Sequence, residues 1–412
     1  MSESTPRIAG LPRLAFAYHP RSFATMAIKE AAEGVCELIW IVDTSDPEIG
    51  SMSRLLRRIG DVVEVAGLSL EQAAGAIAAS RPDGILALAD SLLVWTAQVA
   101  ALLELPFIGP AVAERLTDKY AQRLALQQAG LPVPGFWRVP AEGDEAQWSA
   151  LAQVASFPAV LKPSHGEGSR DTVRVDSLQE LRALVAQTHD AASGATPPEL
   201  VLEQYLQDRP GSAGHHFADY VSVESVVSAG QISHLAITGR FPPAEPFRET
   251  GFFIPCAHGE DERAAIADVA TAAVRAIGVE LGVLHTEVKL TPDGPRVIEL
   301  NGRIGGGVPE MLADATGVEL LPIALRVALG ESIVFDAMPA CEQVGYLLYV
   351  QAPVSMRTVR DVDGIERLRA MAGVEEVTLN RGPGHSVDWR SGNHGHVFSV
   401  RGAVVDLSLI HI

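Results

Sequence analysis

Short apolar runs that alternate with helical stretches fill the first 110 residues and constrain the fold most strongly. LAFAY (Leu14 to Tyr18), ELIWIVD (Glu37 to Asp43) and GILALAD (Gly84 to Asp90) each have the length and composition of a buried strand. Helical patterns such as FATMAIKEAAE separate them. Strands that are apolar on both faces and are joined by helices are typical of a doubly wound parallel sheet. The sequence therefore predicts an α/β fold that begins with a parallel sheet.

The chain is longer than one hydrophobic core usually organises, since it has 412 residues. We expect an N-terminal parallel α/β domain over residues 1–112, a central domain over 113–332 and a small C-terminal α+β unit over 333–412. The first strand is followed by YHPRSF, which lacks the Gly-x-Gly-x-x-Gly pattern of dinucleotide-binding turns. We therefore interpret the N-terminal domain as a scaffold or substrate-side domain.

Charge and cysteine content argue against several classes of partner and site. Lys and Arg number 32 against 51 Asp and Glu, which gives a net charge of −19. A body this acidic repels phosphate backbones, so we expect no nucleic-acid partner. The three cysteines are far apart and fit neither a disulfide framework nor a zinc site. Residues 1–13 show no apolar signal region, and no window reaches about 18 apolar residues, so we predict a cytoplasmic protein without a membrane segment.

Residues 281–303, LGVLHTEVKLTPDGPRVIELNGR, contain two strand-like runs around the turn former Pro-Asp-Gly and predict a β-hairpin. A three-residue loop, 292–294, sets Glu287 directly opposite Glu299. Because side chains alternate across a strand, Val288 and Leu290 on the first strand, and Ile298 and Leu300 on the second, are expected on the apolar face. The polar face is expected to hold His285, Glu287 and Lys289 and, on the second strand, Val297, Glu299, Asn301 and Arg303.

Two facing carboxylates cost energy unless something positive lies between them. Carboxylate and amide oxygens are ligands that Mg²⁺ accepts, together with waters and nucleotide phosphates. The hairpin therefore predicts a metal site of Glu287, Glu299 and Asn301. Taken alone, the same pattern also fits the solvated polar face of an ordinary hairpin.

Lys162 ends an apolar strand and precedes the turn SHGEGSR, whose glycines leave backbone N–H groups free. A lysine and such a turn suit phosphate oxygens, although no P-loop pattern is present. Lys119 follows Asp118 on a helix expected over residues 113–129. In VLEQYL, residues 201–206, a strand is expected to end at Glu203, and exposed backbone follows from Gln204 to Leu206. Each feature alone also fits an ordinary turn or a solvated charge.

The order of these motifs is more specific than any one of them. Over about residues 110–330 the chain resembles the ATP-grasp superfamily, most clearly in HTEVKL and VIELNGRIGGG. Within that superfamily it looks most like the L-amino acid ligases. The resemblance implies an ATP-grasp architecture in which a central ATP-grasp domain stands between the two flanking domains described above.

The resemblance also implies roles for individual residues. Glu287, Glu299 and Asn301 would bind magnesium or manganese, Arg303 would stabilise the transferring phosphoryl group, and Glu249 would hold the amino group of the first amino acid. The residues implied at ATP are Lys119 and Lys162 at the phosphates, the turn around Ser169 closing over them, and Glu203 with the backbone of Gln204 and Leu206 at adenine.

The implied activity is an ATP-dependent carboxylate–amine ligase that forms an amide through an acyl phosphate and releases ADP. The substrates would be a small carboxylate and an amine, with amino acids favoured, and a homodimer is left open. The alternatives are a biotin-carboxylase-like enzyme that activates bicarbonate and a non-catalytic nucleotide-binding protein. For Arg303, the structural alternative is a pairing with a carboxylate such as Glu310 that merely holds the GGG turn. Three positions depart from the ligase pattern, namely Phe252 where His is common, Arg240 where Lys is common, and Tyr220 where a ribose-binding carboxylate is expected.

Overall fold

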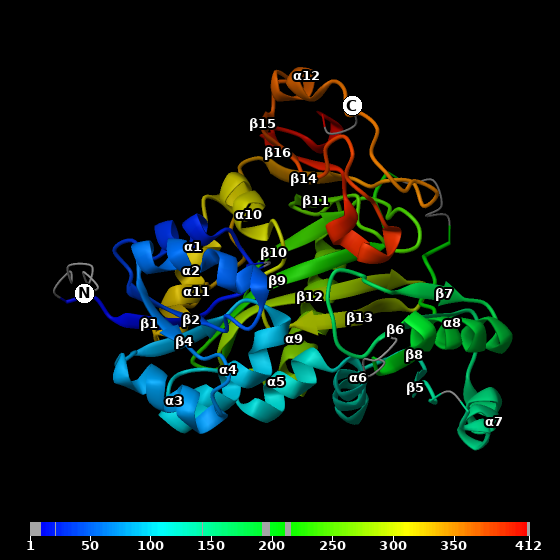
Figure 1. Cartoon of the computed structure of the whole chain (residues 1–412). Coiled ribbons are helices and arrows are strands. Elements are labelled where there is room, and N and C mark those ends of the chain that lie inside the picture. Colours follow the sequence, from blue (N-terminus) through cyan, green and yellow to red (C-terminus); the bar gives the residue numbers. More distant parts are fainter. Residues whose placement is uncertain (1–9, 21, 142, 192–197, 211–215, 410–412) are drawn as a thin grey trace.

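The computed structural model describes residues 10–20, 22–141, 143–191, 198–210 and 216–409, so residues 1–9, which carry part of the prediction about the N-terminus, lie outside it. A four-stranded sheet with the order β3-β2-β1-β4 opens the chain (Figure 1, blue). All its strand pairs are parallel, as the sequence predicts. The strands are β1 (Arg13–Ala17), β2 (Glu37–Val42), β3 (Asp61–Glu64) and β4 (Gly84–Ala87).

Helices connect these strands, and buried side chains such as Phe16, Trp40 and Ile85 form the cores between the layers. β3 was not recognised in the sequence because it lies at the sheet edge and none of its residues is fully buried. Within the described part of the chain, no helix combines the length and the apolar character needed to cross a membrane. The connecting helices are α1 (Thr25–Ala31), α2 (Pro47–Ile59), α3 (Leu70–Ala79) and α4 (Asp90–Leu103).

The single helix expected over residues 113–129 is wrong, because the chain forms α5 (Pro110–Thr117) and α6 (Lys119–Gln128) instead. Asp118 has an extended backbone between them, and its carboxylate accepts hydrogen bonds from the first turn of α6 and from Ser164 Oγ at 2.6 Å. This cap makes Lys119 the first residue of α6 and fastens it to the end of β6 (Ala159–Pro163).

A second sheet of four strands, ordered β5-β8-β6-β7, follows (Figure 1, green). Its neighbouring strands are antiparallel, and the glycine-rich turn connects β6 to β7. Trp148 and Leu181 belong to the apolar cluster that packs the two helices of this unit, over residues 145–154 and 178–191, against the sheet. The remaining elements of this unit are β5 (Phe136–Arg138), α7 (Glu145–Val154), β7 (Val173–Val175), α8 (Leu178–Ala191) and β8 (Leu200–Gln204).

An eight-stranded antiparallel sheet, ordered β13-β12-β9-β10-β11-β14-β16-β15, forms the centre of the molecule. It runs across residue 332, since β14, β16 and β15 extend it; the domain limits at 112 and 332 remain predictions. The strands are β9 (Tyr220–Ser228), β10 (Gln231–Arg240), β11 (Gly251–Ile254), β12 (Gly282–Thr291), β13 (Gly294–Asn301), β14 (Val344–Val350), β15 (Val374–Leu379) and β16 (Phe398–Val404).

Helix α9 (Glu260–Ile277) covers one face of this sheet, where Val223, Val288 and Leu290 join its apolar side chains. The alternation of side chains therefore leaves the polar residues of β9 and β12 on the opposite face. The other elements that follow the hairpin are α10 (Val308–Thr316), α11 (Leu320–Ala328), α12 (Ile365–Arg369) and the 3₁₀ segments η1 (Trp389–Gly395) and η2 (Leu407–Leu409).

The hairpin β12–β13 pairs Glu287 with Glu299, as predicted, but by a different route. Thr291 pairs with Gly294, so the loop has two residues rather than three, and a bulge after Glu287 restores the register. The bulge also corrects the expected faces. Val297 lies in the apolar core with Leu300, whereas Ile298 lines the cavity beside Glu299.

Gln122 of α6 holds the free edge of β13. Its Nε2 donates to Leu300 O at 2.9 Å, and its Oε1 accepts from Leu300 N at 2.8 Å. The amide side chain thus replaces a neighbouring strand for the residue that stands between Glu299 and Asn301.

We expect Gln122→Ala to lower the free energy of unfolding by about 2–4 kcal/mol, because it leaves a buried N–H and a buried carbonyl without partners. Urea denaturation would measure the loss. Gln127→Ala, at an exposed position of the same helix, is the matched control and should change stability by less than about 0.5 kcal/mol. Equal stability of the two variants would contradict the role of Gln122 at the strand edge.

Candidate active site

A cavity of about 800 Å³ lies over the polar face of the hairpin, between the second sheet and the central sheet. Every residue that the sequence predicted for the site lines it, although they come from distant parts of the chain. These residues are Lys119, Lys162, Ser169, Glu203, Gln204, Leu206, Glu249, Glu287, Glu299, Asn301 and Arg303.

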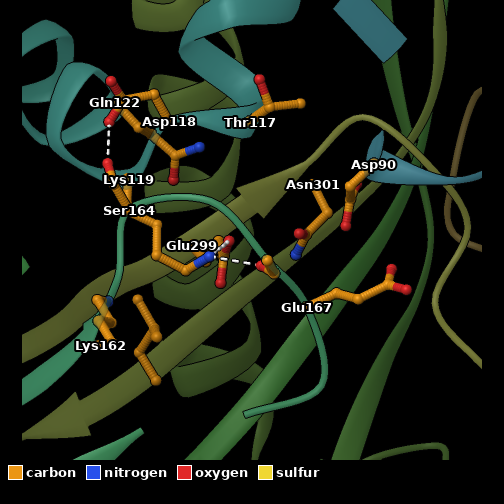
Figure 2. Close-up of polar contacts among 12 residues, drawn as sticks. Asp90, Thr117, Asp118, Lys119, Gln122, Lys162, Ser164, Glu167, Glu299 and Asn301 are labelled. Atoms are coloured by element: carbon orange, nitrogen blue, oxygen red, sulfur yellow. Dashed lines mark hydrogen bonds and ion pairs between the residues drawn. The ribbon is translucent and has the colours of Figure 1, made fainter. Parts of the chain in front are cut away.

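The paired carboxylates of the hairpin have cationic neighbours. Lys119 Nζ lies 3.0 Å from Glu299 Oε1 and donates to Gly166 O at 2.6 Å. Figure 2 shows Lys119 reaching toward Glu299. Burial alone would lower the pKa of Lys119, but the charge of Glu299 raises it, so the ammonium ion is retained. These contacts place the first residue of α6 beside the carboxylate pair and the glycine-rich turn.

The positive charge beside Glu287 comes from His285, which lies two residues earlier on the same strand. His285 Nε2 lies 3.7 Å from Glu287 Oε1, and His285 Nδ1 lies 2.8 Å from the buried Glu224. Although burial opposes both changes, Glu224 raises the pKa of His285 to about 9, and His285 with Arg240 lowers that of Glu287 to about 2. Glu287 is therefore ionised at neutral pH.

The oxygen donors of Glu287, Glu299 and Asn301 suit Mg²⁺. They lie in register on adjacent strands, with Asn301 opposite His285 and only 4% exposed. Two carboxylates and one amide oxygen are fewer than the roughly six ligands of Mg²⁺, which commonly completes its shell with waters and substrate phosphates. This donor set therefore fits a metal that arrives with a nucleotide.

Lys162 and Glu203 form a buried ion pair in the wall of the cavity. Lys162 Nζ lies 2.9 Å from Glu203 Oε2, and Arg123 holds the same carboxylate through Nε and Nη2, both at 3.0 Å. Arg123 was missed in the sequence, although it lies four residues after Lys119 on α6 and so shares its face. Burial would raise the pKa of Glu203, but the two cations lower it to about 2.

Arg303 lies in the turn after β13, which ends at Asn301. Its Nε donates to Asp90 Oδ2 at 2.9 Å, and its Nη2 lies 3.4 Å from Glu167 of the glycine-rich turn. The carboxylate partners of Arg303 are therefore Asp90 and Glu167 rather than Glu310, and its role at the phosphoryl group stays a prediction. Figure 2 shows Asp90 beside Asn301, with Glu167 below them.

Asp90 was not recognised as part of the site. The signal was present, because an acidic residue that follows a buried parallel strand lies at the edge where α/β sheets bind ligands. Burial and the nearby Glu167 and Glu299 raise the pKa of Asp90 to about 6, while Arg303 opposes the increase. Asp90, the first residue of α4, thus brings a carboxylate of the N-terminal unit to Arg303.

Glu249 precedes β11 and lies next to Arg240, whose Nε is 3.8 Å from Glu249 Oε1. Burial raises the pKa of Glu249, although Arg240 opposes this. Two of the departures from the ligase pattern contact each other, since the Arg240 guanidinium lies 4.0 Å from the Phe252 ring centre. It also lies 5.1 Å from the ring centre of Tyr220, the third departure.

Residues 155–310 match the family model described as the ATP-grasp domain. The chain carries an ATP-grasp domain. The match covers β6, the glycine-rich turn, β8 and the hairpin, so it includes most of the cavity described above. The resemblance predicted from the order of the motifs is therefore confirmed.

Comparison with known proteins extends the likeness beyond the ATP-grasp domain. An uncharacterized protein of Sinorhizobium fredii is 30% identical over 73% of this chain and 59% of its own length. Carnosine synthase 1 of Gallus gallus is 31% identical over 64% of this chain and 29% of its own length. The aligned region thus spans less than two thirds of either relative.

Among solved structures, the L-amino acid ligase from Bacillus licheniformis has a TM-score of 0.75 and 22% sequence identity. The superposition covers 97% of this chain and 95% of that one. The α/β fold with ATP-grasp architecture, predicted from the sequence, is therefore confirmed over nearly the whole chain.

We expect Glu203→Gln to lower the free energy of unfolding by about 3–5 kcal/mol at pH 7, because Lys162 and Arg123 would keep buried charges without their counter-ion. Urea denaturation at several pH values tests this. The pKa of Glu203 is lower in the folded than in the unfolded protein, so its contribution is complete above about pH 4.5 and is lost as the pH falls toward 2.

The matched control is Glu199→Gln. Glu199 precedes the same strand, and its side chain is 68% exposed where it pairs with Arg138. This exposed pair should contribute less than about 1 kcal/mol. A Glu203→Gln loss that is no larger than the control loss would show that the buried trio does not stabilise the fold.

Proposed function

We propose that the protein is an ATP-dependent carboxylate–amine ligase with amino acid substrates. The observation that carries this proposal is the convergence of the facing carboxylates Glu287 and Glu299 with Asn301, Arg303 and the two lysines in one cavity. Binding a nucleotide alone does not require a carboxylate pair, an amide and a partly buried arginine at the same point. The family match and the fold of an L-amino acid ligase support the same activity.

The nucleotide would lie between the second sheet and the hairpin. We propose Lys119 and Lys162 as phosphate ligands, with the turn around Ser169 closing over the phosphates. Gln204 and Leu206 would offer backbone groups to adenine. Glu203 would act there mainly by holding Lys162, since both of its oxygens already have cationic partners.

The reaction would proceed in two displacements. An oxygen of the substrate carboxylate attacks the γ-phosphorus of ATP, and ADP leaves; the amine then attacks the acyl carbon, loses a proton and displaces phosphate. Arg303 would neutralise charge that develops on the transferring group, and Glu249 would hold the amino group of the first amino acid. Magnesium bound by Glu287, Glu299 and Asn301 would supply further charge neutralisation at the phosphates.

Two alternatives belong to other classes, a bicarbonate-activating enzyme of the biotin-carboxylase type and a non-catalytic nucleotide-binding protein. A release assay for ADP and phosphate, with each L-amino acid alone, in pairs and with bicarbonate, separates the three. A ligase sustains ADP release only when a carboxylate and an amine are both available, which a pair of amino acids supplies, as does a single amino acid that couples with itself. Release driven by bicarbonate, or tight ATP binding without release under any condition, would overturn the proposal.

Manganese in place of magnesium, a homodimer and a cytoplasmic location remain proposals from the sequence. Metal substitution in the same assay, sedimentation of the purified protein and cell fractionation test them separately.

We expect Glu299→Gln to reduce ADP release by at least about a hundredfold, because one of the two metal carboxylates is lost. Its KM for magnesium should rise as well. Glu280→Gln, an exposed carboxylate just before β12, serves as the control and should retain the parent rate. Parent-like turnover by Glu299→Gln would remove the basis for the metal site.

We expect Arg303→Ala to lower kcat by about a hundredfold or more while weakening ATP binding much less, since the charge on the transferring group develops in the transition state. Arg303→Lys should not restore the rate, because a point charge lacks the planar fork of the guanidinium. Asp90→Asn should lower kcat by a smaller factor, because it removes the carboxylate charge that holds the Arg303 guanidinium in place. A loss of Tm that parallels the loss of activity would instead indicate a structural arginine.

A further inference from the structure

We propose that Asn393 is a positioning residue that connects the glycine-rich turn to Glu249, so that nucleotide binding prepares the amino acid site. This inference rests on the proposed function, which assigns the turn to ATP and Glu249 to the first amino acid. Asn393 lies in η1, more than 140 residues from Glu249 in the sequence. Nothing in the sequence motifs pointed to this segment.

Asn393 binds Glu249 through both ends of its side-chain amide. Its Oδ1 accepts a hydrogen bond from the Glu249 backbone N–H at 2.8 Å, and its Nδ2 donates to Glu249 Oε2. A side chain that both donates and accepts can fix the backbone and the carboxylate of the same residue at once. Asn393 therefore sets the direction of the carboxylate within the cavity.

The backbone of Asn393 contacts the glycine-rich turn on its other side. Its N–H donates to Gly168 O at 2.9 Å. The preceding residue, Gly392, lies so close to the turn that a Cβ atom there would be 2.1 Å from Gly168 O, and its φ of +60° also favours glycine. The two segments therefore touch backbone to backbone.

Asn393 therefore connects the turn proposed for ATP with the residue proposed for the amino acid. Gly166 and Gly168 have positive φ, and glycines give this turn more backbone freedom than other residues would, so we expect bound phosphate to restrict it. Fixing the turn also fixes Gly168 O, and with it the backbone and amide of Asn393. Binding that orders one segment lowers the cost of ordering the other, which produces positive coupling between the two ligands.

The chain provides variants that break this link without removing the site. Asn393→Asp keeps the acceptor for the Glu249 N–H but replaces the donor with a second carboxylate oxygen. Asn393→Ala removes both groups. The fold should survive either change, because Gln351 Nε2 still donates to Glu249 O at 2.7 Å. Asn380→Ala is the matched control, since the Asn380 amide contacts His396 in the same part of the chain without touching Glu249.

The decisive measurement is hydrogen exchange of the full-length protein with and without Mg²⁺ and the non-hydrolysable analogue AMP-PNP, in the absence of any amino acid. In the parent and in Asn380→Ala, we expect the nucleotide to slow exchange by about tenfold or more both in the turn, residues 165–170, and around Glu249, residues 245–251. In Asn393→Ala and Asn393→Asp, the turn should still be protected, whereas residues 245–251 should respond by less than about twofold.

The outcomes separate the link from the function on which it rests. Equal nucleotide-dependent protection of residues 245–251 in the parent and both Asn393 variants overturns the link and leaves the proposed function intact. Absence of protection at the turn in the parent overturns the nucleotide assignment, and the link with it. A purely structural Asn393 would lower Tm and speed exchange at residues 245–251 with and without nucleotide alike, which also overturns the coupling.

Discussion

The pairing of Glu287 with Glu299 on adjacent strands of the hairpin is the constraint on which the rest of the site depends. Two like charges in register on adjacent strands are unfavourable unless cations lie near them. In the folded protein, Lys119 at the start of α6 lies beside Glu299, and His285, two residues before Glu287 on β12, lies beside Glu287. Because each cation is held by a further partner, such as Gly166 O or Glu224, the charge balance extends outward through the surrounding elements.

Capping and edge contacts bring those partners together. Asp118 ends one helix and begins the next, which sets Lys119 at a helix terminus beside the end of β6. Gln122, one turn later, occupies the free edge of β13 and fixes the strand that carries Glu299. Arg123 reaches Glu203 on the second sheet. The short helix α6 thus connects the second sheet to the hairpin. The side chains that make this connection, those of Lys119, Gln122 and Arg123, are polar, and each has a defined partner.

Much of the site was predictable because its residues belong to local patterns. The assumed three-residue loop predicted that Glu287 and Glu299 lie opposite each other, a pairing that the two-residue loop and the bulge of the structure also produce. The strand end at Lys162 with its glycine turn suggested phosphate. The face of Val297 was predicted wrongly because a bulge depends on how two strands settle against their neighbours, which alternation does not describe. Asp90, Arg123 and Asn393 were missed because each is an ordinary residue of its own helix or loop and acquires its partner only across the fold.

The sequence by itself determined the parallel α/β beginning, the hairpin with its paired carboxylates and the order of motifs that the ATP-grasp match confirms. These follow from periodicity and short-range spacing, which are properties of neighbouring residues. Only the tertiary structure decided that Arg303 pairs with Asp90, that Glu203 lies between two cations, and that the C-terminal segment reaches Glu249. Such contacts join residues 41 to 213 positions apart, and the packing of whole sheets, which no local pattern records, brings them within hydrogen-bonding distance.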